Sequence, residues 1–188
     1  MPPRILAPLI GEPLPLDLAN TRPQPGRGVS DAFATVDGLG QWLTAESDRL
    51  PSVRISEVTR KRVVVLRQHV GAALDAIVRG GRPPGSAIDA LNEALRRAPS
   101  YAQLAWTSSG PHVDTIRSGD HDSQLLATIA DSAVEYLTSD LALATRQCEA
   151  PDCEMLFSPT HPRRRWCSPT VCGNRTRVAR YYERHRDS

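Results

Sequence analysis

The sequence predicts a mainly α-helical domain with a small β-sheet, an α+β class, followed by a small cysteine-rich module. Apolar residues recur with the 3.6-residue period of helices in several stretches between residues 37 and 138, and two short segments alternate as strands do. All four cysteines come after residue 147. The chain of 188 residues has room for one ordinary domain, placed at 1–145, and one module at 146–188.

The N-terminal domain opens with a stretch rich in proline and glycine. Within it, Leu14, Leu16 and Leu18 alternate with other residues, which predicts an extended segment or strand. Asp17 and Asn20 stand where this segment turns, and such side chains commonly close turns through their own backbone.

Three helical segments are expected next. Asp37 would cap a short helix, Ser56 would cap a long one that ends near residue 80, and residues 88–97 form a third. The expected inward stripe of the long helix is Val58, Val65, Leu66, His69, Ala72, Ala73 and Ile77, and that of the third helix is Ile88, Leu91 and Leu95. His69 is interpreted as a packing residue.

Residues 101–106 and 111–116 read as two short strands joined by a turn. An amphipathic helix follows over residues 125–138, and residues 140–146 lead to the first cysteine. Because no long loop intervenes, we expect the C-terminal module to be docked on the domain or joined to it by a stiff connection.

The cysteines fall into two pairs, Cys148 with Cys153 and Cys167 with Cys172, in the pattern C-x4-C, thirteen residues, C-x4-C. Zn²⁺ prefers four soft ligands at tetrahedral corners, and two short-spaced pairs supply them. We therefore predict one closed, structural zinc site, with a small β-hairpin in the insert between the pairs.

The cysteines have three alternative uses. Disulfides need an oxidising compartment, and residues 1–8 lack the apolar core of an export signal, so a cytoplasmic protein is expected. Iron–sulfur sites usually group three cysteines closely, whereas the cysteines of this chain come in pairs. Buried free thiols remain the third alternative.

Basic residues concentrate around the second cysteine pair. Between residues 157 and 186 there are eight arginines and one acid, Glu183, which gives a local charge of +7, whereas the whole chain carries +2. Such a concentration on one small module indicates a polyanionic partner. Lys61 is the only lysine, a bias that also fits a GC-rich genome.

The segment after Cys167 predicts a helix with Ser168 as its N-cap and Pro169 in its first turn. This places Cys172 in the first turn, as in treble-clef-like fingers built from a knuckle, a β-hairpin and a helix. At 100° per residue, one face of this helix presents Arg177, Arg180, Arg184, Tyr181 and Asn174. Such a face suits a DNA groove. Val178, Ala179 and Tyr182 are expected to pack on the knuckle.

The remaining arginines and the tryptophan of the module are expected to differ in role. The run Arg163, Arg164 and Arg165 is expected to contact nucleic acid with the helix. Arg175 falls on the packing side and is expected to bond knuckle carbonyls or Asp152, and Trp166 is expected to cover the metal.

The run from Arg146 through Leu156-Phe157, the segment Arg163–Ser168 and the tetrapeptide Cys172-Gly-Asn-Arg175 resemble the CGNR zinc finger. Members carry this finger at the C-terminus of bacterial proteins whose N-terminal part is the ABATE domain, regarded as stress-induced transcription regulators. The segment Leu16-Asp-Leu-x-Asn-Thr21 is similar to the signature that opens that domain, which makes Asp17 and Asn20 candidates for binding a ligand. Pro169 and the proline-rich tip at residues 158–162 depart from the family pattern.

The resemblance implies a ligand- or stress-responsive transcription regulator with DNA as its partner and an unknown small-molecule effector. A basic zinc module also suits structured RNA, so an RNA- or ribosome-associated stress factor is the alternative. We expect no enzyme, because His112, His121 and Asp122 stand in no catalytic motif, and no membrane span, because no apolar run is long enough. A homodimer built on residues 1–145 is expected, because one small reader offers few base contacts.

Overall fold

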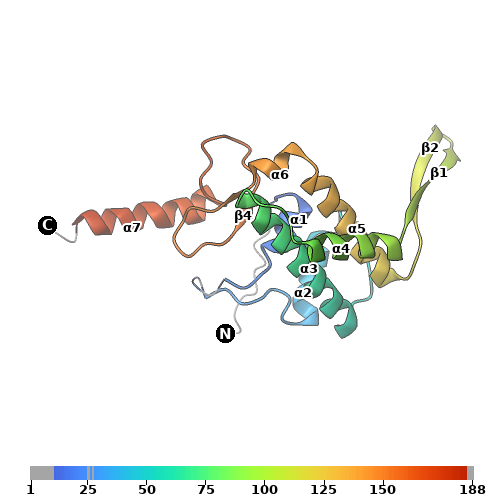
Figure 1. Cartoon of the computed structure of the whole chain (residues 1–188), viewed down its shortest axis with the longest axis horizontal. Coiled ribbons are helices and arrows are strands. Elements are labelled where there is room, and N and C mark those ends of the chain that lie inside the picture. The colour runs from blue at the N-terminus through green and yellow to red at the C-terminus, as the bar shows by residue number, and fades with distance from the viewer. Residues whose placement is uncertain (1–10, 25, 27, 186–188) are drawn as a thin grey trace.

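The computed structural model describes residues 11–24, 26 and 28–185. The segment 1–8, in which no export signal is predicted, and Arg186 of the basic run lie outside the described residues. The N-terminal domain is a bundle in which α1 (Leu14–Ala19) contacts both α3 (Glu57–Val78) and α5 (His121–Leu137). Helix α4 (Gly85–Arg97) packs on α3 and α5, α2 (Val36–Ala45) packs on α3, and α6 (Asp140–Ala144) follows α5 (Figure 1).

The predicted strand at residues 14–18 is wrong, because this segment is helix α1. All six of its residues are buried, including Asp17 and Pro15. The alternation of leucines therefore carries no information about a buried and an exposed face. Pro15 lies in the first turn, where a missing N–H costs no helical hydrogen bond.

The long helix α3 begins as predicted, with Ser56 accepting a hydrogen bond from the Thr59 N–H at 3.0 Å. Its inward face is rotated from the predicted stripe, since Val58 and Val65 are 63% and 51% exposed. A buried arginine interrupts the apolar pattern: Arg67 is 3% exposed and lies 2.7 Å from Asp31. The buried side chains of α3 include Val63, Leu66, Val70 and Leu74.

Two other sequence predictions for the bundle need correction. Thr35, not Asp37, caps α2, because its side chain accepts a hydrogen bond from the Gly38 N–H at 3.1 Å. On α4, Ile88 is 37% exposed, and the buried residues are Ala87, Leu91 and Ala94.

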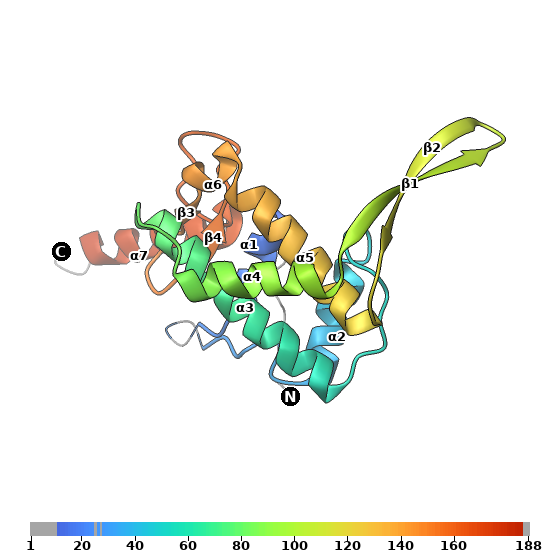
Figure 2. The ribbon, with the colours of Figure 1, turned by 45° about the vertical axis from the view of Figure 1, so that its right-hand side comes forward.

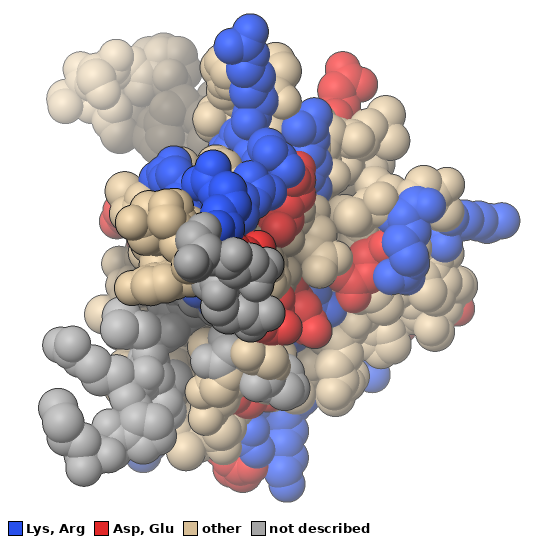
Figure 3. Space-filling view, turned by 90° about the vertical axis from the view of Figure 1, so that its left-hand side faces the viewer, with Lys and Arg blue, Asp and Glu red and all other residues tan. Residues whose placement is uncertain are grey.

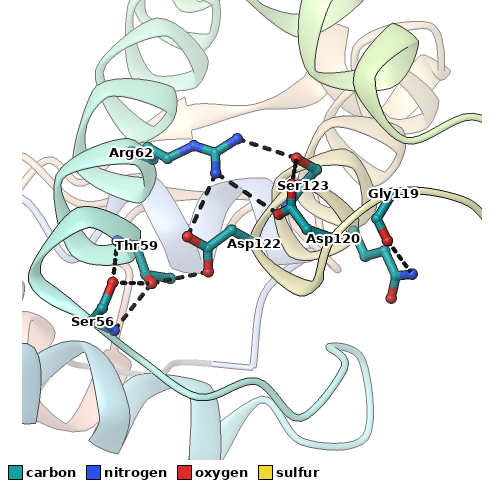
Figure 4. A network of polar contacts seen from close by, with 8 residues as sticks. Ser56, Thr59, Arg62, Gly119, Asp120, Asp122 and Ser123 are labelled. Carbon is teal, nitrogen blue, oxygen red and sulfur yellow. Dashed lines mark hydrogen bonds and ion pairs between the residues drawn. The ribbon is translucent and has the colours of Figure 1, made fainter.

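A polar network ties the N-termini of α3 and α5 together (Figure 4). Asp120 caps α5 by accepting from the Ser123 N–H at 2.8 Å, and Asp122 accepts from the Thr59 hydroxyl at 2.9 Å. Arg62 donates to the Ser123 hydroxyl at 3.2 Å. Asp122 thus has a structural partner on α3, in keeping with a capping turn.

The two predicted strands form an antiparallel hairpin, β1 (Ser100–Thr107) and β2 (Gly110–Arg117), which projects from the bundle as an arm (Figures 1 and 2). Its register pairs Ser100 with Arg117 at the base and Thr107 with Gly110 at the tip. The small predicted sheet is therefore present, but it lies outside the helical core.

The C-terminal module consists of β3 (Arg146–Gln147), β4 (Leu156–Phe157), a π-helical turn η2 (Pro169–Gly173) and α7 (Asn174–His185). It has its own core around the cysteines, with Met155 and Phe157, whereas Leu156 joins the core of the helical bundle. The module is thus docked on the domain, as expected. Among the residues that the structure describes, no helix is both long and apolar enough to cross a membrane.

Candidate metal centre and basic helix

The first cysteine pair lies on a knuckle between β3 and β4. The Cys148 N–H donates to the Met155 carbonyl at 2.9 Å, and the Cys153 N–H donates to the Ala150 carbonyl at 3.2 Å. Asp152 adopts a left-handed backbone with φ of 59°, which an aspartate tolerates better than most residues. The β-hairpin of the finger therefore flanks the first pair. The prediction of a hairpin in the thirteen-residue insert is wrong, because beyond β4 the insert runs as a loop.

The second cysteine pair lies at the start of the last helix, as predicted. The Ser168 hydroxyl accepts from the Val171 N–H at 3.2 Å, and Pro169 occupies the first turn. The Cys172 N–H donates to the Ser168 carbonyl at 2.9 Å, which brings Cys172 beside Cys167. A β-carbon at position 173 would lie 3.2 Å from the Trp166 ring, so the glycine allows this indole to pack against the cysteine core.

The four sulfur atoms lie within 4.8 Å of one another, and all four cysteines are buried. The Sγ of Cys167 is 3.8 Å from that of Cys153 and 3.5 Å from that of Cys172. Four thiolates around one Zn²⁺ at about 2.3 Å would stand about 3.8 Å apart at tetrahedral corners. The cluster therefore fits a structural zinc site held by Cys148, Cys153, Cys167 and Cys172.

The four thiols are close enough to shift one another's pKa. Hydrogen bonds from Cys148 and Cys167 lower the pKa of the Cys153 thiol to about 2, whereas burial raises the pKa of Cys172 to about 11. Hydrogen bonding with Cys148 and Cys153 raises the pKa of Cys167 as well. Zinc ligation requires thiolates, so binding of the ion would release protons from this cluster.

Basic side chains gather around the projecting end of the module (Figure 3). Arg177, Arg180 and Arg184 are exposed on α7, and Tyr181 stacks on His185 with ring centroids 4.1 Å apart. The Arg177 guanidinium contacts the Asn174 side-chain oxygen. All the side chains predicted to form the reading face of the helix are therefore exposed to solvent.

The expected packing face of α7 is wrong. Val178 and Tyr182 are 53% and 68% exposed, and Thr176 is the buried residue of the helix. Its hydroxyl donates to the Cys172 carbonyl at 2.9 Å. The helix leaves the knuckle after its first turn and projects from the molecule (Figure 1). A helical wheel shows which residues share a face, but it does not show whether that face has a packing partner.

The three consecutive arginines before Trp166 have different environments. Arg163 is exposed, and Arg165 pairs with Glu149 at 2.5 Å while remaining 48% exposed. Arg164 is 17% exposed and faces the protein: it donates to Glu12 and to the Cys167 carbonyl, both at 2.7 Å. The predicted nucleic-acid contact of Arg164 is corrected to a docking contact, because a phosphate would have to break both bonds.

Arg175 lies on the knuckle side of the helix, where its guanidinium donates to the Pro151 carbonyl at 2.6 Å. This is a knuckle carbonyl of the kind predicted. We expect Arg175→Ala to lower the stability of the zinc module by roughly 1 kcal/mol, since one charge-assisted hydrogen bond is lost at an exposed site. The readout is the rate of zinc transfer to a chromogenic chelator, with Arg180→Ala as the control. Unchanged transfer together with lost nucleic-acid binding would instead make Arg175 a reader.

The two candidate ligand-binding residues on α1 both contact protein groups. Asp17 is 1% exposed and lies 2.8 Å from Arg49. The side-chain amide of Asn20 pairs with the backbone of Leu156, donating to its carbonyl at 2.9 Å and accepting from its N–H at 2.8 Å. Glu12 adds an acceptor for the Ser158 N–H at 2.8 Å. The α1 segment is therefore a docking site for the finger, a role that the sequence did not indicate.

We expect Asn20→Ala to lower the free energy of unfolding by about 2 kcal/mol, because it leaves both buried backbone groups of Leu156 without a partner. Hydrogen exchange of the Leu156 amide should accelerate while the bundle amides near α4 stay protected. Asn92→Ala, an exposed change on α4, is the matched control. Equal protection of Leu156 in both variants would contradict the docking role.

The site defines a class: a helical domain that carries a structural four-cysteine zinc finger with an exposed basic helix. Comparison with known families places two of them on this chain. The ABATE family, described as "Putative stress-induced transcription regulator", matches residues 12–140, and the CGNR zinc finger matches residues 145–185. Since the first match covers more than half of the chain, the protein belongs to the ABATE family. No curated protein matches the chain.

Proposed function

We propose that this protein is a DNA-binding transcription regulator that acts by binding rather than by catalysis, with α7 as its reading element. The observation that carries the proposal is the exposed set of Arg177, Arg180 and Arg184 on a helix that projects from the body. A free helix with guanidinium groups along one face can enter the major groove and bond both phosphates and guanine edges. Arg163 and Arg165 lie on the loop before the helix and would contact the phosphate backbone of the DNA.

We further propose that an effector controls this finger through α1. A cavity of about 390 Å³ is lined by Leu14 and Pro15 of α1, by Arg49 and by Tyr136 of α5. The Tyr136 hydroxyl lies 2.6 Å from that of Thr145, one residue before β3. A small molecule in this cavity would contact α1, which binds the finger through Asn20, and α5, whose Tyr136 contacts Thr145.

The proposal is tested by titrating the zinc-loaded chain onto a duplex of random sequence at several salt concentrations. Three to five arginine–phosphate contacts predict that log K falls against log salt with a slope of roughly −3 to −5. A salt-independent association, or no association at low salt, would contradict an arginine-based interface.

A further inference from the structure

The outer half of the projecting arm, β1 with β2, is amphipathic, although both of its faces meet solvent. Residues directly opposite in an antiparallel pair share a face. The register therefore puts Leu104 with Val113, and Trp106 with Pro111, on one face. On this face Leu104 is 73% exposed, Val113 is 66% exposed and Trp106 is 76% exposed. The opposite face carries Gln103 with Asp114 and Ala105 with His112 in its outer part, and Tyr101 with Ile116 near the base.

Such an arm needs a partner. A two-stranded hairpin is marginally stable by itself, and contiguous exposed apolar side chains mark interaction surfaces. The arm is unsuited to serve as a nucleic-acid ribbon, because its one arginine, Arg117 at the base, contacts Asp131, and residues 100–116 contain no lysine or arginine. It also projects away from its own bundle (Figure 2), so the occupant of its apolar face belongs to another molecule.

The bundle offers a matching acceptor next to the root of the arm. A groove of about 350 Å³ runs between α3 and α4, with Val65, Ala90, Ala94 and Leu126 among its apolar lining. Val65 is half exposed there. Arg97, at the end of the groove, precedes the first residue of β1 by three positions.

We propose that two copies of this chain form a closed dimer in which each arm lays Trp106 and Leu104 in the α3–α4 groove of the other. Within the described part of the chain, nothing fills the groove or covers the apolar face of the arm, and both surfaces belong to the same chain. A two-fold axis that seats one arm in the partner's groove also seats the second, because symmetry repeats the contact. The groove lining carries a net positive charge from Lys61, Arg62 and Arg97 against Glu93, whereas the arm carries the acid Asp114.

The length of the arm sets the reach of the contact. Eight residues per strand give an arm of about 27 Å. Each copy contributes one arm and one groove, so four surfaces are covered, and a standard interface needs about 800 Å² from each partner. The dimer rests on the proposed function in that it would supply the regulator with two reading helices. Its test does not involve nucleic acid.

The experiment is sedimentation equilibrium of the zinc-loaded full chain between low and high micromolar concentration. Trp106→Ser and Val65→Asp should each weaken the dimer at least roughly 30-fold, as expected for a central contact. Tyr101→Ser, an aromatic change on the opposite face of β1, and Ile88→Asp, on α4 outside the groove, should change it less than about 3-fold. All four positions are exposed, and circular dichroism verifies their folding.

Mixing the two interface variants tests the exchange itself. The Trp106→Ser chain keeps its groove and the Val65→Asp chain keeps its arm, so the mixture should form a heterodimer that neither variant forms as a homodimer. A wild-type chain that stays monomeric overturns the proposal, as does a Val65→Asp chain that dimerises like wild type, which would mean that arms pair with arms. Arg180→Ala should dimerise normally, so failure of the reading helix remains distinguishable.

Discussion

Replacing any one of Cys148, Cys153, Cys167 or Cys172 by serine should reduce bound zinc from one ion per chain to none. The buried sulfurs hold the knuckle, the loop and the start of α7 together, and the core of the module contains few other side chains. Structural zinc contributes about 10–16 kcal/mol to the folding of such modules. Loss of the ion should therefore unfold the chain from about residue 146 onward.

The helical bundle should survive this loss but melt at a lower temperature. Leu156 is 2% exposed in the bundle core, and Asn20 would lose both of its hydrogen bonds to that residue. The measurements are metal analysis and calorimetry before and after chelation, with Ser168→Ala as a control that keeps all ligands. Iron in place of zinc, or paired disulfides, would contradict the site.

Replacing Arg177, Arg180 and Arg184 together by alanine should weaken nucleic-acid binding at least about 100-fold. Each contact of this kind is worth about 1 kcal/mol or more, and the three side chains share one exposed face of α7. The salt slope should fall by about three, because three counterion-releasing contacts disappear. Zinc content should not change.

The matched control for this variant is the triple replacement of Arg54, Arg79 and Arg82, which are exposed on the helical domain. It removes the same formal charge from another part of the chain. If both triple variants bound DNA equally weakly, net charge rather than the helix would account for binding.

The sequence predicts well the features that depend on residues close together in the chain. Cysteine spacing predicts the zinc cluster, a serine cap with the following proline predicts the start of the last helix, and alternation with a turn predicts β1 and β2. In each case the chemistry lies within a few neighbouring residues. The contact of Arg175 with the Pro151 carbonyl spans 24 positions, and it follows from the place of Arg175 on the knuckle side of the helix.

The misplaced features depend on tertiary contacts. The leucines of α1 are buried on every side, so their alternation indicates a strand where the bundle encloses a helix. Arg67 is buried because Asp31 faces it, which shifts the inward face of α3. Arg164 turns inward because Glu12, 152 positions away, accepts a hydrogen bond from its guanidinium. A pattern of neighbouring residues contains no information on such distant partners.

The central claim, that α7 reads DNA, is tested most directly by selection from a random DNA pool. The zinc-loaded full chain is incubated with the pool at physiological salt in the presence of a structured RNA competitor. The account predicts enrichment of one DNA sequence, retained against the RNA and lost with the Arg177, Arg180 and Arg184 replacement. Displacement of all DNA by the RNA, or enrichment that persists in the triple variant, would contradict it.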